Sequence, residues 1–579
     1  MTMTGGALVV RALEDEGITL AFGIPGTHNI ELYDALAESD TVRPVLVTDE
    51  QSAGFMADGA WRASGRMACV NIVPGAGLTH AMSGIAEAFM DNVPMLVLAC
   101  GIRRDTGRRF QLHDVDQMAM ARPVTKAQLR PVRGEEIYRT VREACRIARA
   151  GAPGPVLVEI PANLYLFRHE SPLAHEAAPA PIPAPAPDER EIRRAADLLN
   201  DAKRPLLYVG LGAAGADLVA LAERLEAPVA TTFQGKGVFP ESHPLALWPG
   251  FGDAAPPFAR GVAAGCDATL AIGCRFGEVA TGSYGLTPPA PLIHVDIEPS
   301  ALGANHPAEV GIAADAAAFV RALLPLLAPR DRSAAMREAI RAGREDVARG
   351  WESAASRGRV TPSRLLRALQ RRLGPDTVFT SDSGNGTFLA MECLTLDRPG
   401  RFLAPVDYSC MGYAVPAAIG ARLALPDAPV VALAGDGAFL MTGLELLTAA
   451  QRGVPVMVFV LRDRELAQIA QFQSVAMNRK TCSVLPDYDL AAICRGVGVT
   501  CLALDRDADI DGVLDRAGAL AGEGQPVVVD TAVDYASKTY FTRGVVRTNL
   551  ARLPWPDRLR FIGRAAVRRL RGGGARGGW

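Results

Sequence analysis

The sequence lacks the features that would direct it into a membrane, onto nucleic acid or out of the cell. No run of about 18 apolar residues occurs, so we expect no membrane-spanning helix. The formal net charge of −2 gives no electrostatic case for binding nucleic acid. The ten cysteines include no Cys-x-x-Cys pair, which argues against a disulfide framework or a zinc site. We therefore expect a cytoplasmic protein with reduced thiols.

The first 17 residues also lack the marks of a secretory signal. Glu14, Asp15 and Glu16 follow a short apolar run, where a signal peptide has a basic start and a longer apolar core. The composition is instead that of a globular protein, with 49% hydrophobic and 21% charged residues. A chain of 579 residues is too long for one hydrophobic core, and we expect three domains.

A strand followed by Gly435-Asp436-Gly437 is the segment around which the rest is organised. Residues 430–434 are small or branched and apolar, as in a buried parallel strand. The flanking glycines permit a sharp turn and a close approach to a ligand. Asp436 would then lie at the carboxyl end of a strand, where open α/β sheets bind ligands. A plain surface turn is the alternative. We expect the next helix to begin at Leu444.

A second acid follows one strand-helix-strand unit later. The apolar strand over 455–461 leads into Arg462-Asp463-Arg464-Glu465. Because neighbouring parallel strands end at the same edge of a sheet, Asp463 and Asp436 can share one Mg²⁺. This ion commonly binds through one or two carboxylates together with a diphosphate.

Strands alternate with helical patterns along most of the chain, which predicts an α/β protein of three doubly wound parallel-sheet domains. A proline-rich segment indicates a stiff linker, and a charged helical segment a connector. The C-terminal tail is basic, and we expect its glycine-rich end, Gly572–Gly578, to be disordered. The predicted units are 1–168, the linker 169–188, the central domain 189–328, the connector 329–358, the third domain 359–545 and the tail 546–579.

Several motifs resemble those of one enzyme family. The segment 50–59 is similar to the Glu-Gln-x-Ala-x-x-Met-Ala-x-Gly motif of thiamine-diphosphate enzymes, and 435–437 followed by Asp463 resembles their diphosphate signature. The segment 408–420 resembles Gly-x-x-Gly-x-Met-Gly-x-x-x-Pro-Ala-Ala-x-Gly. The segment 110–126 is similar to the corresponding part of acetolactate synthases. The chain therefore resembles acetolactate synthase-like thiamine-diphosphate enzymes.

This resemblance implies roles for particular residues. Glu50 would contact the aminopyrimidine N1′ of the cofactor and hand it a proton, and Met411 would be an apolar wedge between the cofactor rings. The Ser409 carbonyl would accept from the 4′-amino group. The implied cofactors are thiamine diphosphate and Mg²⁺. The remaining implied contacts are Gly75, Gly435 and Gly437 to the cofactor, and Asp436, Asp463 and the main-chain carbonyl of Glu465 to the metal.

The chain also departs from the family pattern. His80 replaces an Asn in the loop that begins at Gly75, and Phe472 stands where those synthases carry a Trp. A smaller aromatic would leave room for an acceptor bulkier than pyruvate. Gln111 and His113 are the other catalytic candidates. His113 is either a proton shuttle near the cofactor or a polar loop histidine without a role.

The central segment resembles the FAD-binding middle domain of acetolactate synthases. The run 210–215 follows an apolar strand as Gly-x-Gly-x-x-Gly, which is weak evidence alone. Two further segments that resemble this family domain contain Arg275 and Asp296. We expect these two residues to lie nearest to the flavin. The resemblance implies FAD in a structural, non-redox role.

The resemblance implies decarboxylation of a 2-oxo acid followed by ligation to a second carbonyl compound. Lys126 and Arg275 would attract the second acid. The family assembles its site between two subunits, so a homodimer or homotetramer is implied. Three alternatives stay open: a lyase that releases an aldehyde, a flavin-dependent 2-oxo acid oxidase, and a non-catalytic cofactor-binding subunit. Intact Glu50 and Asp436 argue against the last.

Overall fold

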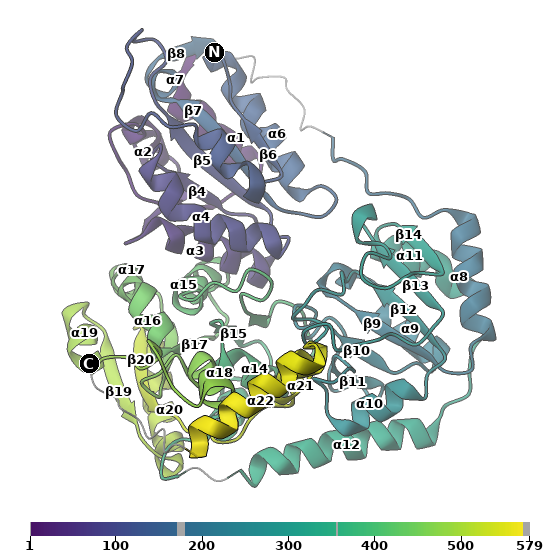
Figure 1. The fold of residues 1–579 in the computed structure, drawn as a ribbon. Helices are drawn as coiled ribbons and strands as arrows, with labels where there is room; N and C mark the ends of the chain where they lie inside the picture. Colours follow the sequence, from purple (N-terminus) through teal and green to yellow (C-terminus); the bar gives the residue numbers. More distant parts are fainter. Residues whose placement is uncertain (1, 171–179, 355–356, 571–579) are drawn as a thin grey trace.

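The computed structural model describes residues 2–170, 180–354 and 357–570. Three six-stranded sheets, all parallel, form three separate domains (Figure 1). The N-terminal domain is purple to blue, the central domain teal, and the third domain mostly green. The expected fold class, three doubly wound parallel-sheet domains, is confirmed.

The N-terminal sheet has the strand order β3-β2-β4-β5-β7-β6. Its central strands β5 and β7 are buried at every position, because helices cover both faces of a parallel sheet. The strands are β2 (Leu20–Gly23), β3 (Arg43–Leu46), β4 (Cys69–Ile72), β5 (Met95–Gly101), β6 (Ala127–Leu129) and β7 (Pro155–Pro161), with β1 (Thr2–Thr4) pairing antiparallel with β8 (Arg168–Glu170). The helices are α1 (Gly5–Asp15), α2 (Ile30–Ala37), α3 (Glu50–Ser64), α4 (Ala76–Met90), α5 (Gln117–Ala121), α6 (Ile137–Arg149) and α7 (Ala162–Leu166).

The central sheet has the order β11-β10-β9-β12-β13-β14. Numbered within the domain, this is 3-2-1-4-5-6, the order of dinucleotide-binding folds. The strands are β9 (Pro205–Val209), β10 (Val229–Thr231), β11 (Ala246–Pro249), β12 (Ala268–Ile272), β13 (Leu292–Asp296) and β14 (Val310–Ala313). The helices are α8 (Glu189–Asp201), α9 (Leu218–Leu225), α10 (Pro257–Ala264), α11 (Ala316–Leu323) and the connecting α12 (Ala334–Glu352).

The third sheet has the order β16-β15-β17-β18-β20-β19. Within its domain this is 2-1-3-4-6-5, and the N-terminal sheet has the same order. The strands are β15 (Val378–Ser381), β16 (Phe402–Leu403), β17 (Val430–Gly435), β18 (Met457–Arg462), β19 (Thr500–Leu504) and β20 (Val527–Ala532). The helices are α13 (Pro362–Leu373), α14 (Asn385–Cys393), α15 (Ala414–Ala424), α16 (Asp436–Thr442), α17 (Leu446–Arg452), α18 (Ala467–Met477), α19 (Leu490–Gly496) and α20 (Ile510–Gly522).

Two further helices follow the third sheet. Helix α21 (Tyr540–Arg552) runs across residue 545, where the sequence placed the end of the domain. Helix α22 (Trp555–Leu570) contains much of the basic tail, and Arg568 donates a 2.7 Å hydrogen bond to the carbonyl of Met477 at the end of α18. The glycine-rich end expected to be disordered, Gly572–Gly578, lies outside the described residues.

Helices α3 and α15 pack together where the N-terminal and third domains meet (Figure 1). A Cβ atom on Gly59 would lie 2.3 Å from the carbonyl oxygen of Ala417, and one on Gly420 would lie 2.0 Å from that of Met56. Any larger residue would collide with backbone at either position. The contact therefore depends on glycine from both domains.

A buried ion cluster lies at the same junction. The guanidinium of Arg62 on α3 pairs with Asp58 at 2.7 Å and with Asp91 at 2.6 Å. It also donates to the carbonyl of Ala404 in the third domain. The hydroxyl of Tyr413 donates to Asp58 at 2.5 Å. The buried charges are thus paired and hydrogen-bonded, which is the condition for placing them inside a protein.

Candidate active site

Asp436 is the first residue of helix α16, directly after strand β17. The helix expected from Leu444 is present as a 3₁₀ turn (Gly443–Glu445) followed by α17, and the unexpected element is α16, which precedes it. The intervening residues, which include Phe439 and Leu440, are compatible with a helix, so the chain turns into one as soon as the strand ends. Carboxylates are stabilised in the first turn of a helix by its macrodipole, and Oδ1 of Asp436 accepts from the backbone of Gly437 at 2.9 Å.

Asp463 lies beside Asp436, as the strand pattern predicts. Strands β17 and β18 are adjacent and parallel, with Gly435 opposite Leu461. Burial, and then the charge of Asp436, raise the pKa of Asp463 to about 7. The side chain of Glu465 is engaged in an ion pair with Lys480. A buried and a half-buried carboxylate that repel each other in this way suit a divalent cation.

A cavity of about 140 Å³ opens between these acids and the loop after β15. Met411, Gly435 and Gly437 line it together with both acids, so the third-domain residues of the predicted cofactor site come together here. Oδ2 of Asp382 and Nδ2 of Asn385 are buried without a hydrogen-bond partner among the described residues, and both residues line the cavity. These polar groups fit a polar ligand such as a diphosphate with its metal.

Ser409 lies at the boundary of this cavity. It lines a neighbouring cavity of about 190 Å³, which shares Ser383 and Gly384 with the first. Its hydroxyl is 2.7 Å from that of Ser383. The backbone of Ser409 is left-handed, with φ at +67°, a conformation that non-glycine residues adopt mainly at special turns.

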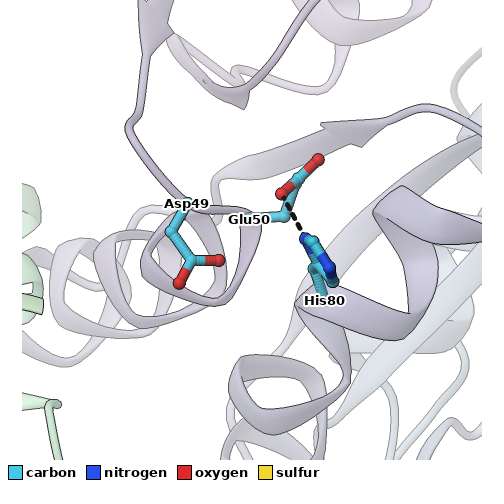
Figure 2. A group of neighbouring side chains, drawn as sticks. All are labelled: Asp49, Glu50 and His80. Atoms are coloured by element: carbon cyan, nitrogen blue, oxygen red, sulfur yellow. Dashed lines mark hydrogen bonds and ion pairs between the residues drawn. The ribbon is translucent and has the colours of Figure 1, made fainter. Parts of the chain in front are cut away.

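Glu50 is the first residue of α3 and is buried. Asp49 caps this helix by accepting from the backbone of Gln51 at 3.2 Å. Nδ1 of His80, on α4, lies 3.2 Å from Oε2 of Glu50 (Figure 2). Within the described residues, Asp49, Glu50 and His80 are also the one trio of metal-ligating types whose ligand atoms all lie within 4.8 Å of one another. The one signal for His80 in the sequence was its replacement of an Asn in the family loop.

The loop after β5 carries the other N-terminal candidates. A Cβ atom on Gly75 would lie 3.2 Å from the carbonyl oxygen of His113, so glycine lets this loop approach α4. The ring of His113 packs edge-on against that of His28, with centroids 5.4 Å apart. Gln111 donates within its own loop, to the carbonyl of Arg108. Sequence reasoning missed His28, which follows a Pro-Gly turn and had no motif to mark it.

The two sets of candidates do not meet within one chain. Every residue that lines the cavity at Asp436 belongs to the third domain, between Asp382 and Tyr535. Glu50, Gly75, Gln111 and His113 belong to the N-terminal domain and are absent from its lining.

Arg275 and Asp296 line one cavity, of about 300 Å³, at the carboxyl ends of the central strands. The guanidinium of Arg275 donates to Asp407 and to the carbonyl of Met90, each at 2.7 Å, and so contacts both other domains. Burial raises the pKa of Asp296. The glycine run 210–215 contains a 3₁₀ turn, Leu211–Ala213, and the next helix, α9, begins at Leu218.

The structure gives Lys126 a different role from the expected attraction of a substrate acid. Its ammonium group donates to the carbonyl oxygens of Ile147 at 2.9 Å and Ala150 at 2.5 Å. These carbonyls end helix α6, so the cation caps a helix. Burial lowers its pKa.

Comparison with known families matches all three domains. The family described as thiamine pyrophosphate enzyme, N-terminal TPP binding domain, matches residues 3–120. The central domain of the same enzymes matches residues 192–323, and their C-terminal TPP binding domain matches residues 382–531. The chain belongs to the thiamine pyrophosphate enzymes.

Similar proteins extend over nearly the whole chain. A probable acetolactate synthase large subunit of Methanocaldococcus jannaschii is 30% identical over 92% of each chain. An acetolactate synthase of Mycobacterium bovis is 32% identical, over 92% of this chain and 88% of its own. The isozyme 3 large subunit of Escherichia coli is 29% identical, over 93% and 96%. Like them, this chain is a thiamine-diphosphate-dependent enzyme. In the part of the chain that the structure describes, no helix is both long and apolar enough to cross a membrane.

Proposed function

We propose that this enzyme decarboxylates a 2-oxo acid and ligates the product to a second carbonyl compound, with Mg²⁺ as the metal. The observation that carries the proposal is the pair of acids, the buried Asp436 and the half-buried Asp463, at adjoining strand ends beside Met411. Thiamine diphosphate, when bound, supplies the electron sink for the decarboxylation. The protein would hold its diphosphate through the metal and present the Glu50 carboxyl as a proton donor.

The metal fits the donor set at the end of β17 and β18. Asp436 and Asp463 offer hard oxygen ligands, and burial, followed by the charge of Asp436, raises the pKa of Asp463. Mg²⁺ keeps several ligands from water and phosphate, so two carboxylates suffice from the side chains. The Glu465 side chain would not join them, because Lys480 engages it.

We also propose that the active enzyme is a homodimer or homotetramer in which the site is shared. The support is the separation of Glu50 from the cavity at Asp436 within one chain. If each site takes Glu50 from one subunit and Asp436 from its partner, mixing inactive Glu50→Gln and Asp436→Ala subunits should restore about a quarter of wild-type activity. A mixture as inactive as its components would contradict the shared site.

FAD in a structural role is the proposal for the central domain. The strand order and the cavity with Arg275 and Asp296 suit a dinucleotide. A cavity of about 300 Å³ is at the lower end of the range for ligand sites. Purified protein that shows no flavin absorbance near ~450 nm after reconstitution with excess FAD would contradict this proposal, since that band belongs to the cofactor itself.

Ligation rather than aldehyde release is supported mainly by the relatives, which are named acetolactate synthases. Phe472 on α18, a smaller ring than Trp, supports an acceptor bulkier than pyruvate. The ammonium group of Lys126 donates to a backbone carbonyl of α6. One of the two cations that were expected to attract the second acid is therefore engaged elsewhere.

The test is to incubate the enzyme with pyruvate, thiamine diphosphate and Mg²⁺ and to identify the products by mass spectrometry. Acetolactate or acetoin is expected. Acetaldehyde as the dominant product would favour a lyase. Repeating the assay with larger 2-oxo acids and aldehydes as acceptors would identify the second substrate. Glu50→Gln is the inactive control.

A further inference from the structure

Helices α3 and α4 touch at a pair of glycines, and this contact places His80 over Glu50. A Cβ atom on Gly54 would lie 2.7 Å from the Cα of Gly84, and the reverse distance is the same. Glu50 and His80 each precede their glycine by four residues, which is one helical turn. The close approach of the two backbones therefore brings the imidazole to 3.2 Å from the carboxylate (Figure 2).

The two side chains differ in their access to water. In a single chain, the Glu50 side chain is 10% exposed and the His80 side chain is 66% exposed. We propose that His80 is a positioning residue that passes protons between solvent and Glu50. This inference rests on the proposed function, in which Glu50 exchanges a proton with the cofactor.

The transfer balances as a simple proton relay. Solvent gives a proton to Nε2 of His80, forming the imidazolium, and Nδ1–H gives one to Oε2 of Glu50. The imidazole is left neutral with its proton on Nε2, and exchange with water restores the other tautomer. One proton moves from solvent to Glu50. The Nδ1–H bond breaks, an Nε2–H bond and an O–H bond form, and no electron is transferred. An imidazole suits this task because its ordinary pKa lies near neutral pH.

The other titratable groups near Glu50 are engaged elsewhere. The Asp49 carboxylate caps α3. Glu445 of the third domain accepts from the backbone and hydroxyl of Thr48, and burial raises its pKa. Burial also raises the pKa of Tyr33 far above neutrality. Among these neighbours, His80 is the one whose ordinary pKa suits proton exchange with water at pH 7.

The first test uses the cofactor-free protein, labelled with ¹³C at histidine Cε1, and records the NMR signal of His80 at neutral pH. His80→Asn assigns the signal. Glu50→Gln should move this signal, because it removes the carboxylate that lies 3.2 Å from the ring. His243, which faces Glu223 at 3.4 Å in the central domain, is the matched histidine whose signal should stay in place. An unmoved His80 signal would overturn the pairing.

The second test uses the holoenzyme and follows hydrogen–deuterium exchange at C2 of the bound cofactor against pH. His80→Asn should slow the exchange about tenfold, leave the cofactor Kd unchanged, and respond to added imidazole, which replaces the missing relay. His243→Asn should behave as wild type. If His80→Asn exchanges at the wild-type rate at every pH while Glu50→Gln is slow, the relay is wrong and the role of Glu50 stands. If Glu50→Gln also exchanges normally, the proposed function itself fails.

Discussion

The N-terminal and third domains have the same strand order but carry different chemistry at their strand ends. In the N-terminal domain the candidate acid, Glu50, follows the edge strand β3 and faces an imidazole. In the third domain the acids Asp436 and Asp463 follow the inner strands β17 and β18 and face each other. The shared frame fixes where side chains can meet, and the residue types decide what they can do.

The partner of each acid explains the difference. A carboxyl beside an imidazole can exchange protons near neutral pH, whereas two carboxyls beside each other repel and raise the pKa of one of them. The first arrangement suits proton transfer and the second suits a cation. This contrast predicts that substitution of Glu50 impairs proton transfer, whereas substitution of Asp436 or Asp463 impairs cofactor binding.

Glu50→Gln should abolish proton transfer while cofactor binding persists. The substitution keeps the shape of the side chain and removes the exchangeable proton, so C2 hydrogen–deuterium exchange should fall by roughly 10²–10⁴-fold. NMR of the quenched cofactor measures the exchange, and calorimetry measures the Kd. If Glu50→Gln weakened cofactor binding and left the C2 exchange unchanged, the two domains would not differ in the step that they support.

Arg62→Met should break the junction that holds the two domains together. It leaves Asp58 and Asp91 as buried charges without their partner, at a cost of about 3–5 kcal/mol. Arg341→Met is the matched control, because the pairs of Arg341 with Glu338 and Glu345 are exposed and contribute at most about 1 kcal/mol. Denaturant midpoints of the two variants should differ clearly. Equal midpoints would mean that the buried cluster adds no stability.

Asp436→Ala should weaken thiamine-diphosphate binding in Mg²⁺ by about 100-fold or more, because the metal offsets phosphate charge in a confined site. Asp463→Asn should stay within about tenfold of wild type, since the amide oxygen remains a ligand. Isothermal titration with and without Mg²⁺ measures both. Equal and severe losses in the two variants would show that the charge of Asp463 matters beyond ligation.

The pKa of Glu392, which lies away from either site, predicts how the stability of the protein depends on pH. Burial raises its pKa to about 7, so the folded protein binds this proton more tightly than the unfolded chain does. Its favourable contribution is therefore present below the unfolded pKa and is lost as the pH rises from about 4 to about 7, by at most about 3 kcal/mol. Wild type should lose stability relative to Glu392→Gln over this range. Parallel stability curves would contradict the shifted pKa.

The local patterns predicted much of this structure from sequence. The apolar run 430–434 became a strand at the expected residues, and glycines beside Asp436 marked a strand end that does line a cavity. These features depend on period, length and turn chemistry, which a short stretch of sequence contains.

The features that sequence did not predict depend on contacts between distant segments. Lys126 matched a family motif, yet the carbonyls of α6 engage it. His28 meets His113 only because two loops converge. The start of α16 at Asp436 was missed for a local reason, since the glycines suggested a longer turn than the chain makes.

The reciprocal glycine contacts between α3 and α15 have a consequence for protein engineering. Because Gly59 and Gly420 each press against backbone of the other helix, the two helices form a matched pair with no tolerance for independent change. A chimaera that takes one thiamine domain from a relative must therefore take both helices from that relative. Otherwise the two helices will clash where they pack together. Domain boundaries in general are crossed by few contacts, so recombination points for libraries belong between domains.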